Sequence, residues 1–524
     1  MRRALALFTI VTFGGFTTPA QAQTSGDAAP LSAIDWLSRS VEAPFVSPQA
    51  VVLQGDAANS GPAVSTGALA PTVTSSTLDG PSPDRIGLLP GTVTGLPRSL
   101  WSHSDQATLI DLMAAERVET LPALQDLMMT LLLAEADPPL NATPDGRLFV
   151  ARIDHLLDMG ALDPALSMLE AADVTTPELF RRWFDVSLLT GTEDKACRQM
   201  QEKPDIAPTL PARIFCLARA GEWETAALVL NTGRALGDIN EETDILLSRF
   251  LDPDLYEGEA PLPPPSRPSP LVFRLREAIG ERLATAPLPR AFANADLSDT
   301  AGWRNQIEAA ERLARSGAVT ENLLDSLYTR ARPSASGGIW DRAAAYQAFD
   351  TAITGGNPDD IGDALITLWP LIETARIEVP IARLYAADLA GVQLGEAAQV
   401  ISYHMQLLSP LYEAAAQSYD GNDRADLFLK AVAQGDLSEQ TPQGPYESAV
   451  MRGFTNAGPS RTLAYLTAQG QLGEALLRSI ALFTEGLSSD PNAVSDALAL
   501  FRSVGMEDIA RRAALQYLLL DRRA

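Results

Sequence analysis

Apolar residues recur at fixed distances from three glycines, Gly160, Gly191 and Gly221, which lie 31 and 30 residues apart. Large apolar residues stand eleven and seven positions before each glycine, a spacing that places them on one helical face. An alanine stands five positions after each glycine, and Leu or Met stands nine after. Glycine ends a helix readily because it adopts the left-handed conformation without a Cβ clash. The stretch 149–230 therefore predicts repeated helix–turn–helix units.

The same rhythm returns near the C-terminal end, where Gly435, Gly470 and Gly505 are spaced by 35 residues. Alanines again follow the last two glycines by five positions. Proline behind a capping residue predicts further helix starts. These starts are at Asp163-Pro164, Thr176-Pro177, Asn357-Pro358 and Asp490-Pro491. Ser102 or Ser104 is expected to cap the first helix of the body, and there is almost no alternating strand pattern. We therefore expect an all-α body.

The turn Gly221-Glu-Trp223-Glu-Thr-Ala226 resembles that of tetratricopeptide-like repeats. That family's turn has glycine, a large residue two positions on and alanine five positions on. The stretches after Gly160 and Gly470 match it in part, while the family's first-helix Trp and Gly-x-x-Tyr features are absent. The resemblance implies an α-solenoid with a period of about 30–39 residues. It also implies a concave protein-binding surface, and it implies no chemistry.

Residues 1–22 have the pattern of a secretory signal peptide. Met1-Arg2-Arg3 is basic, residues 4–16 are uncharged and largely apolar, and Ala20-Gln21-Ala22 is an A-x-A cleavage site. The apolar run is too short for a stable membrane span. The alternative is an uncleaved anchor. We expect cleavage after Ala22 and a periplasmic protein of a Gram-negative envelope, or else a secreted one.

Residues 23–100 are rich in Ala, Pro, Ser, Thr and Gly, and we expect this tail to be disordered. One exception is a short amphipathic helix at 31–43, which has a start signal and ends at Pro44. It could dock on its own body or on another protein. A second exception, 86–90, could be an extended docking segment or plain linker. The candidate docking residues are Leu31, Ile34, Trp36, Leu37 and Val41.

Seven prolines between residues 252 and 270 interrupt the helical pattern. Proline blocks helix and favours extended structure. We interpret this segment as a linker between an N-terminal helical block, 101–251, and a C-terminal block, 271–524. The alternative is that it lies ordered along the helices. If it is a linker, cleavage there should release two folded blocks.

The formal charge of −26, or −28 without Arg2 and Arg3, would repel nucleic acid and anionic lipid. No later stretch is apolar enough for a membrane span after signal cleavage. The acidity therefore favours protein partners in the cell envelope, or basic or neutral surfaces. The alternative is that it serves solubility alone. The oligomeric state stays open.

Two cysteines, Cys197 and Cys216, fall on neighbouring predicted helices. In an oxidising compartment this pair predicts one disulfide. The alternative is two buried free thiols. The three histidines, His103, His155 and His404, form no metal motif, and no nucleotide-binding or nucleophile motif is present. We predict no catalytic residue, no metal and no cofactor.

One enzymatic alternative rests on Glu447-Ser448, because the catalytic Glu of some lytic transglycosylases is followed by Ser. The remaining 77 residues carry helical repeats, and a helix start is the favoured interpretation. We expect a periplasmic, non-catalytic helical-repeat scaffold or adaptor for another envelope protein, for example in a motility, division or cell-wall machine. The alternatives are a peptidoglycan enzyme or its regulatory subunit, and a secreted structural or surface protein.

Overall fold

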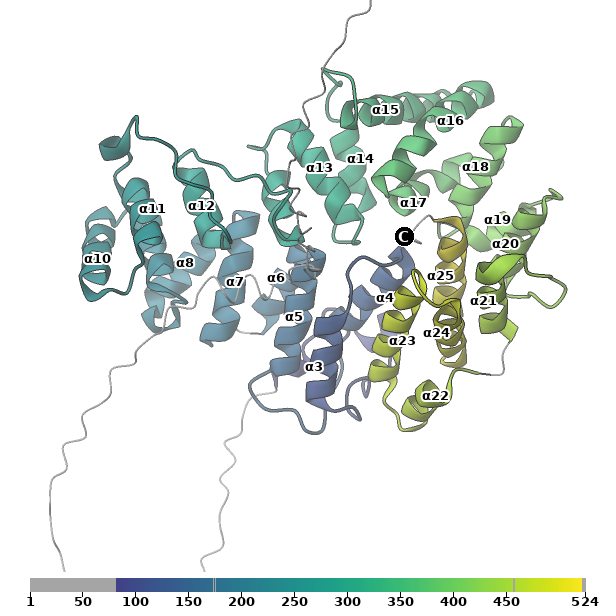
Figure 1. Ribbon diagram of the computed structural model, residues 1–524, viewed down its shortest axis with the longest axis horizontal. Helices are drawn as coiled ribbons and strands as arrows, with labels where there is room; N and C mark the ends of the chain where they lie inside the picture. Colours follow the sequence, from purple (N-terminus) through teal and green to yellow (C-terminus); the bar gives the residue numbers. More distant parts are fainter. Residues whose placement is uncertain (1–81, 173, 175, 456–457, 521–524) are drawn as a thin grey trace, which may run out of the picture.

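The computed structural model describes residues 82–520 except 173, 175, 456 and 457 (Figure 1). Within these residues every regular element is a helix, and the single β-bridge joins Leu89 to Ala134. The prediction of an all-helical body is confirmed, and the arrangement is consistent with an α-solenoid-like fold. The signal peptide and the helix proposed at 31–43, with Leu31, Ile34, Trp36, Leu37 and Val41, lie outside the described residues.

The N-terminal elements are η1 (Pro83–Arg85), α2 (Gly91–Thr94), α3 (Gln106–Ala115), α4 (Pro122–Leu133), α5 (Arg147–Met159), α6 (Leu162–Ala171), α7 (Pro177–Thr190), α8 (Glu193–Glu202), η2 (Pro204–Ile206), α9 (Leu210–Arg219), α10 (Trp223–Leu236), α11 (Glu241–Leu251), η3 (Pro253–Tyr256), α12 (Pro270–Ala278) and η4 (Arg290–Leu297). The later elements are α13 (Trp303–Ala314), α14 (Glu321–Thr329), α15 (Ile339–Gly355), α16 (Pro358–Ala375), α17 (Glu378–Leu389), α18 (Glu396–Leu407), α19 (Tyr412–Ser418), α20 (Arg424–Gln434), α21 (Gly444–Thr455), α22 (Arg461–Ala468), α23 (Leu472–Gly486), α24 (Pro491–Ser503) and α25 (Glu507–Leu519).

The predicted glycine turns are present. Gly160 and Gly191 end α5 and α7 with φ of 79° and 74°, and Gly221 has φ of 83° between α9 and α10. An L-residue with a Cβ would be strained in this left-handed conformation. The alanines five positions on are fully buried where neighbouring helices meet: Ala165, Ala196, Ala226, Ala475 and Ala510.

Helix starts follow the predicted caps in three cases out of four. Thr176, Asn357 and Asp490 each accept a hydrogen bond from a backbone N–H of the following turn. The expectation for Asp163-Pro164 is wrong, because α6 begins at Leu162 and places Pro164 inside its first turn. The N–H groups in the first turn of a helix have no acceptor within the helix, so a proline, which lacks an N–H, is tolerated there.

The cap of α3 is also corrected. Asp105, rather than Ser102 or Ser104, precedes the helix and accepts a hydrogen bond from the Thr108 N–H at 2.9 Å. The carboxylate of Asp105 also accepts a hydrogen bond from the Asn141 amide. An ionised cap satisfies an orphan N–H and complements the helix dipole.

Helices α5 to α11 pack one on the next in chain order, and α7 to α11 form a projection that we call the arm (Figure 1). A row of aromatic rings connects the hydrophobic core of successive helix pairs in the arm. Phe184 of α7 lies 6.4 Å from Phe215 of α9, whose ring lies 5.8 Å from that of Phe250 in α11. Each helix pair thus covers the apolar face of its neighbour.

The proline-rich segment turns the chain back along the arm. The guanidinium of the buried Arg276 donates to the carbonyls of Leu262 and Pro263, and Arg249 donates to the carbonyl of Ala260. Beyond it, α12 packs on α7, and η4 packs on α5 and α7. The alternative of an ordered segment lying along the helices therefore describes residues 257–269 better than a free linker.

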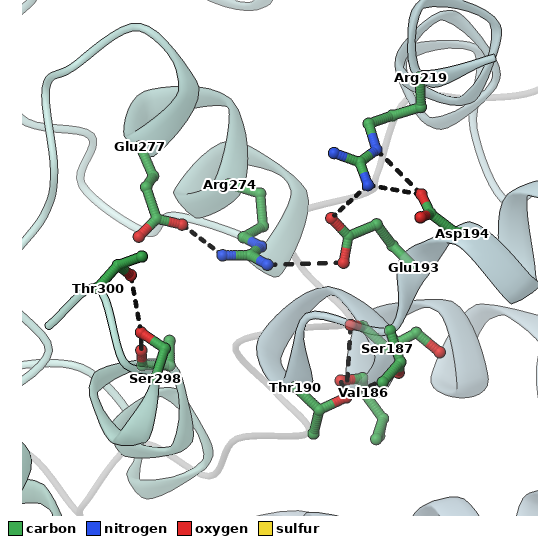
Figure 2. A network of polar contacts seen from close by, with 12 residues as sticks. Val186, Ser187, Thr190, Glu193, Asp194, Arg219, Arg274, Glu277, Ser298 and Thr300 are labelled. Atoms are coloured by element: carbon green, nitrogen blue, oxygen red, sulfur yellow. Dashed lines mark hydrogen bonds and ion pairs between the residues drawn. The ribbon is translucent and has the colours of Figure 1, made fainter.

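A network of charges fastens α12 to the arm (Figure 2). Arg274 of α12 pairs with Glu277 in its own helix and, at 3.5 Å, with Glu193 at the start of α8. The other oxygen of Glu193 lies 3.6 Å from Arg219 of α9, which also pairs with Asp194. Glu193 is buried, so these two guanidinium groups must offset the free-energy cost of removing its carboxylate from water.

The last helices close onto the first ones. Helix α25 packs on α4, and α23 packs on α3 and α4, which brings together residues almost 400 positions apart (Figure 1). We call this contact the closure seam. Helix α4 has no side-chain cap of its own, and the buried Gln516 of α25 accepts the Ala123 N–H at 2.8 Å. The hydroxyls of Thr120 and Thr484 hydrogen-bond at 2.7 Å.

The seam is also close-packed at Trp101. Its side chain is fully buried, and a Cβ added at Gly473 would lie 2.4 Å from its ring. The Gly473 N–H donates to the Leu100 carbonyl at 3.1 Å. Any larger residue at 473 would separate α23 from the N-terminal segment.

The boundary of the disordered tail at residue 100 is wrong, because residues 82–100 are ordered on the body. The fully buried Arg152 of α5 donates to the carbonyls of Asp84 and Ile86, and to those of Leu132 and Ala134. The buried carboxylate of Asp84 accepts the Phe149 N–H at 2.6 Å. Within this stretch, the alternative of an extended docking segment at 86–90 describes the structure better than plain linker. The N–H groups of Leu88 and Leu89 donate to the Leu133 carbonyl, and the Glu135 N–H donates to the Leu89 carbonyl.

Glu116, at the end of α3, gives the closure seam a pH dependence. Burial raises the pKa of its carboxyl to about 8, although a hydrogen bond with the Ala481 backbone acts in the opposite direction. The folded state therefore keeps a proton that the unfolded chain loses near pH 4.5. Stability should fall as the pH rises from about 4.5 to about 8.

Glu116→Gln should remove this loss and raise the free energy of unfolding near pH 8 by about 5 kcal/mol relative to the original chain. Urea unfolding at a series of pH values measures the difference. The exposed Glu439→Gln is the matched control and should not change the pH profile. Parallel profiles for E116Q and the original chain would contradict the assignment.

Candidate functional site

Cys197 of α8 and Cys216 of α9 form the predicted disulfide, with Sγ atoms 2.02 Å apart. Both residues are buried, at 4% and 2% exposure. The bond ties together two neighbouring helices of the arm, next to the Glu193–Arg219 contact. Its position supports the arm and leaves the sulfur atoms inaccessible to a substrate.

Helix α10 lies at the end of the arm (Figure 1), and its outer face carries two exposed leucines. Leu228 is 66% exposed and Leu236 is 71% exposed. With Thr232 and Ala235 they follow the spacing i, i+4, i+7, i+8, which places all four on one side of the helix. The opposite side, with Ala226 and Leu230, is buried where α10 packs on α9.

Trp223 stands at the first position of α10 and is half exposed. Its ring lies 6.2 Å from that of Phe250, so it is the exposed end of the aromatic row in the arm. Leu255 of η3, five residues after Phe250, is 69% exposed. We call Trp223, Leu228, Leu236 and the acidic side chains between residues 222 and 259 the arm tip.

A second candidate is a cavity of about 510 Å³ among the ends of α16, α18 and α25 and the start of α17. It is lined by Trp369, Glu373, Thr374, Arg376, Glu378, His404, Leu408, Leu519 and Leu520. Partial burial raises the pKa of Glu373, and a hydrogen bond with Trp369 opposes that shift. This mixture of carboxylates, imidazole and indole suits a small polar or cationic group.

The imidazole of His404, which lines this cavity, is held in place by a hydrogen bond. Its Nε2 lies 2.8 Å from the carboxylate of Asp426 in α20, which also accepts the Tyr419 hydroxyl at 3.0 Å. The adjoining Arg376 has φ of 57°, the one positive value outside glycine among the described residues. The carbonyl of the preceding residue, Ala375, accepts a hydrogen bond from the Arg315 guanidinium.

The third site is a charge junction between four helices, which includes α4 and α25 of the closure seam. Asp126 of α4 pairs with Arg383 of α17 and, at 2.7 Å, with Arg512 of α25. Arg383 also reaches Glu321 of α14 at 3.0 Å. These side chains are one fifth to one third exposed, so the pairs are partly desolvated. The junction joins α4 to α25 and offers no reactive group.

The remaining sequence candidates lie apart from one another. His155 is buried in α5, where desolvation lowers its pKa to about 4. His103 lies against Gly470 at the closure seam. Glu447 lies in the first turn of α21, where its carboxylate accepts the Gln443 N–H. In the described part of the chain, no group of three His, Cys, Asp or Glu side chains is arranged for a metal ion.

Among the described residues, no helix combines the length and the apolar character that crossing a membrane requires. The chain matches no protein-family model, no curated protein and no solved structure.

The arm tip and the charge junction were not found from the sequence. Leu228 and Leu236 stand outside the repeat positions that Ala226 and Leu230 occupy, and in the sequence they resemble any other leucines of an amphipathic helix. They are exposed because no other helix of the described residues covers this side of α10. Asp126, Arg383 and Arg512 are single charges far apart in the chain. A run of acidic residues around α10 and α11 was the one available signal for the tip.

The disulfide should stabilise the arm. Replacing both cysteines by alanine should lower the free energy of unfolding by about 3 kcal/mol, because the unfolded chain loses its cross-link. Urea unfolding with and without reductant measures the effect. Reductant should destabilise the original chain to the same extent and leave the double variant unchanged. Two titratable thiols in the exported, denatured protein would contradict the bond.

Proposed function

We propose that the protein is a non-catalytic helical-repeat scaffold of the bacterial cell envelope, which binds and positions another protein. The observation that carries this proposal is the arm tip, where Leu228 and Leu236 are more than 60% exposed at the end of a projecting stack of helices. Exposed apolar side chains grouped on one helical face are typical of protein interaction surfaces.

The repeat interpretation supports the same function. The pairs α5–α6, α7–α8, α9–α10, α22–α23 and α24–α25 each turn at a glycine with positive φ. Five residues after each of these glycines comes an alanine. Stacked helix pairs of this kind present extended surfaces for protein partners. The departures from one period fit a body whose ends must meet at the closure seam.

The envelope location rests on two observations. The sequence begins with the pattern of a cleavable leader, and the cysteines form a disulfide that an oxidising compartment would maintain. The disulfide lies within the arm, so the compartment that forms it also stabilises the surface proposed to bind a partner.

Photocrosslinking in intact cells tests this function. A photoreactive phenylalanine placed at Leu228 should capture an envelope protein, and the same residue at Leu140 should not. Leu140 is the matched control because it is 88% exposed in the loop before α5. Mass spectrometry identifies the captured chain. Failure to capture any protein from positions across the body, together with peptidoglycan cleavage by the purified protein, would contradict the scaffold function and favour the enzymatic alternative.

A further inference from the structure

The outer face of α10 lacks the polar cover that usually ends a stack of helix pairs. A terminal helix whose outer face meets water normally carries polar side chains there. In α10, Leu228 and Leu236 occupy that face, and helices α9 and α11 contact α10 on its other sides. The two leucines lie eight residues apart, about 12 Å along the helix. This length suits the apolar side of a partner helix of about three turns.

The segment that forms the arm tip is strongly acidic. Between Glu222 and Glu259 the chain has ten acidic and two basic residues, a net charge of −8. Both basic residues are engaged. Arg234 donates to both carboxylate oxygens of Asp244, and Arg249 contacts Glu259 and Glu281. The exposed acids are Glu222, Glu224, Asp238, Glu241, Glu242, Asp252, Asp254, Glu257 and Glu259.

These acids stand next to the apolar positions. Glu224 is one helical turn before Leu228 on the same side of α10. Asp238, Glu241 and Glu242 follow Leu236 within six residues and are all exposed. A ligand that covers the leucines would therefore bring its flanking side chains against carboxylates.

We propose that the arm tip binds a basic amphipathic helix of a partner protein, with its apolar side on Leu228 and Leu236 and its Lys or Arg side chains on the surrounding acids. This inference rests on the scaffold function and adds the chemistry of the partner. The apolar contact supplies affinity, and the charge complementarity selects basic partners and speeds their encounter.

The negative charge of the arm tip disfavours three other ligands: a second copy of the chain, residues 31–43 and an anionic lipid surface. A second copy would bring another net −8 against the first, so self-association through this face is opposed. Residues 31–43 of this chain carry Asp35, Arg39 and Glu42, a net of −1, and offer no basic flank. An anionic lipid surface would be repelled by the same acids.

Synthetic peptides test the proposal. The probe is a labelled helical peptide with leucines on one side and lysines flanking them, and its partner probe carries glutamates in place of the lysines. Fluorescence anisotropy with the mature chain, residues 23–524, measures both affinities. The lysine peptide should bind, and its affinity should fall about tenfold for Leu228→Ser with Leu236→Ser, the loss expected of two central apolar contacts. The glutamate peptide should not bind.

Two control variants separate the tip from the general acidity of the protein. Tyr465→Ser removes an exposed apolar side chain from α22 and should leave the affinity unchanged. Glu224→Gln with Glu241→Gln should weaken binding and flatten its salt dependence, whereas Asp359→Asn with Asp360→Asn, exposed acids at the start of α16, should have little effect. Equal loss from both acidic pairs, or equal binding of the two peptides, would overturn the proposal.

Two other outcomes would assign the face to a different occupant. A dimer in sedimentation equilibrium that Leu228→Ser dissociates would assign it to a second copy. Peptide binding that appears only after deletion of residues 31–43 would assign it to this chain's own segment. Either result overturns the basic-partner proposal and leaves the scaffold function standing, because photocrosslinking in cells reports on that function separately.

Discussion

The closure seam is the constraint on which the rest of the structure depends. The N-terminus of α4 has no cap within its own sequence, and Gln516 supplies the missing acceptor from α25. Orphan N–H groups of a buried helix end are costly when unpaired, so the first and last helices stabilise each other. Close packing of Trp101 on Gly473 and the pairing of Asp126 with two arginines act at the same contact.

Closure also explains the course of the middle of the chain. Helices α7 to α11 lead away from the body, so the chain must return before α13 can begin. The segment 257–297 makes that return. Arg276 donates to the carbonyls of Leu262 and Pro263, and Arg274 pairs with Glu193 of the arm. This segment covers the arm on the side of α7 and leaves the outer face of α10 exposed. The proposed binding surface is thus a consequence of the path of the chain.

Local features were predictable from the sequence because their causes are local. Gly160 and Gly191 require left-handed backbone, Thr176 and Asp490 cap the helices that follow them, and Cys197 and Cys216 fall on adjacent helices. Features that depend on distant contacts were missed. Arg152 holds the backbone of residues 82–90 through hydrogen bonds to the carbonyls of Asp84 and Ile86. Asp126 pairs with Arg383 and Arg512, which lie far from it in the sequence. No periodicity marks such contacts, so the tail boundary and the meeting of the two chain ends could not be read from the pattern.

Cleavage within the proline-rich segment tests the central claim most directly. A protease site inserted at residues 264–266 leaves the arm in one fragment and α12 to α25 in the other. The closure seam, with α12 and η4 packed on the arm, should hold the fragments together, so that they co-elute in size-exclusion chromatography under native conditions and separate only in denaturant. Asp126→Ala with Gln516→Ala should weaken that association. Separation of two folded fragments under native conditions would contradict a body closed by its own ends.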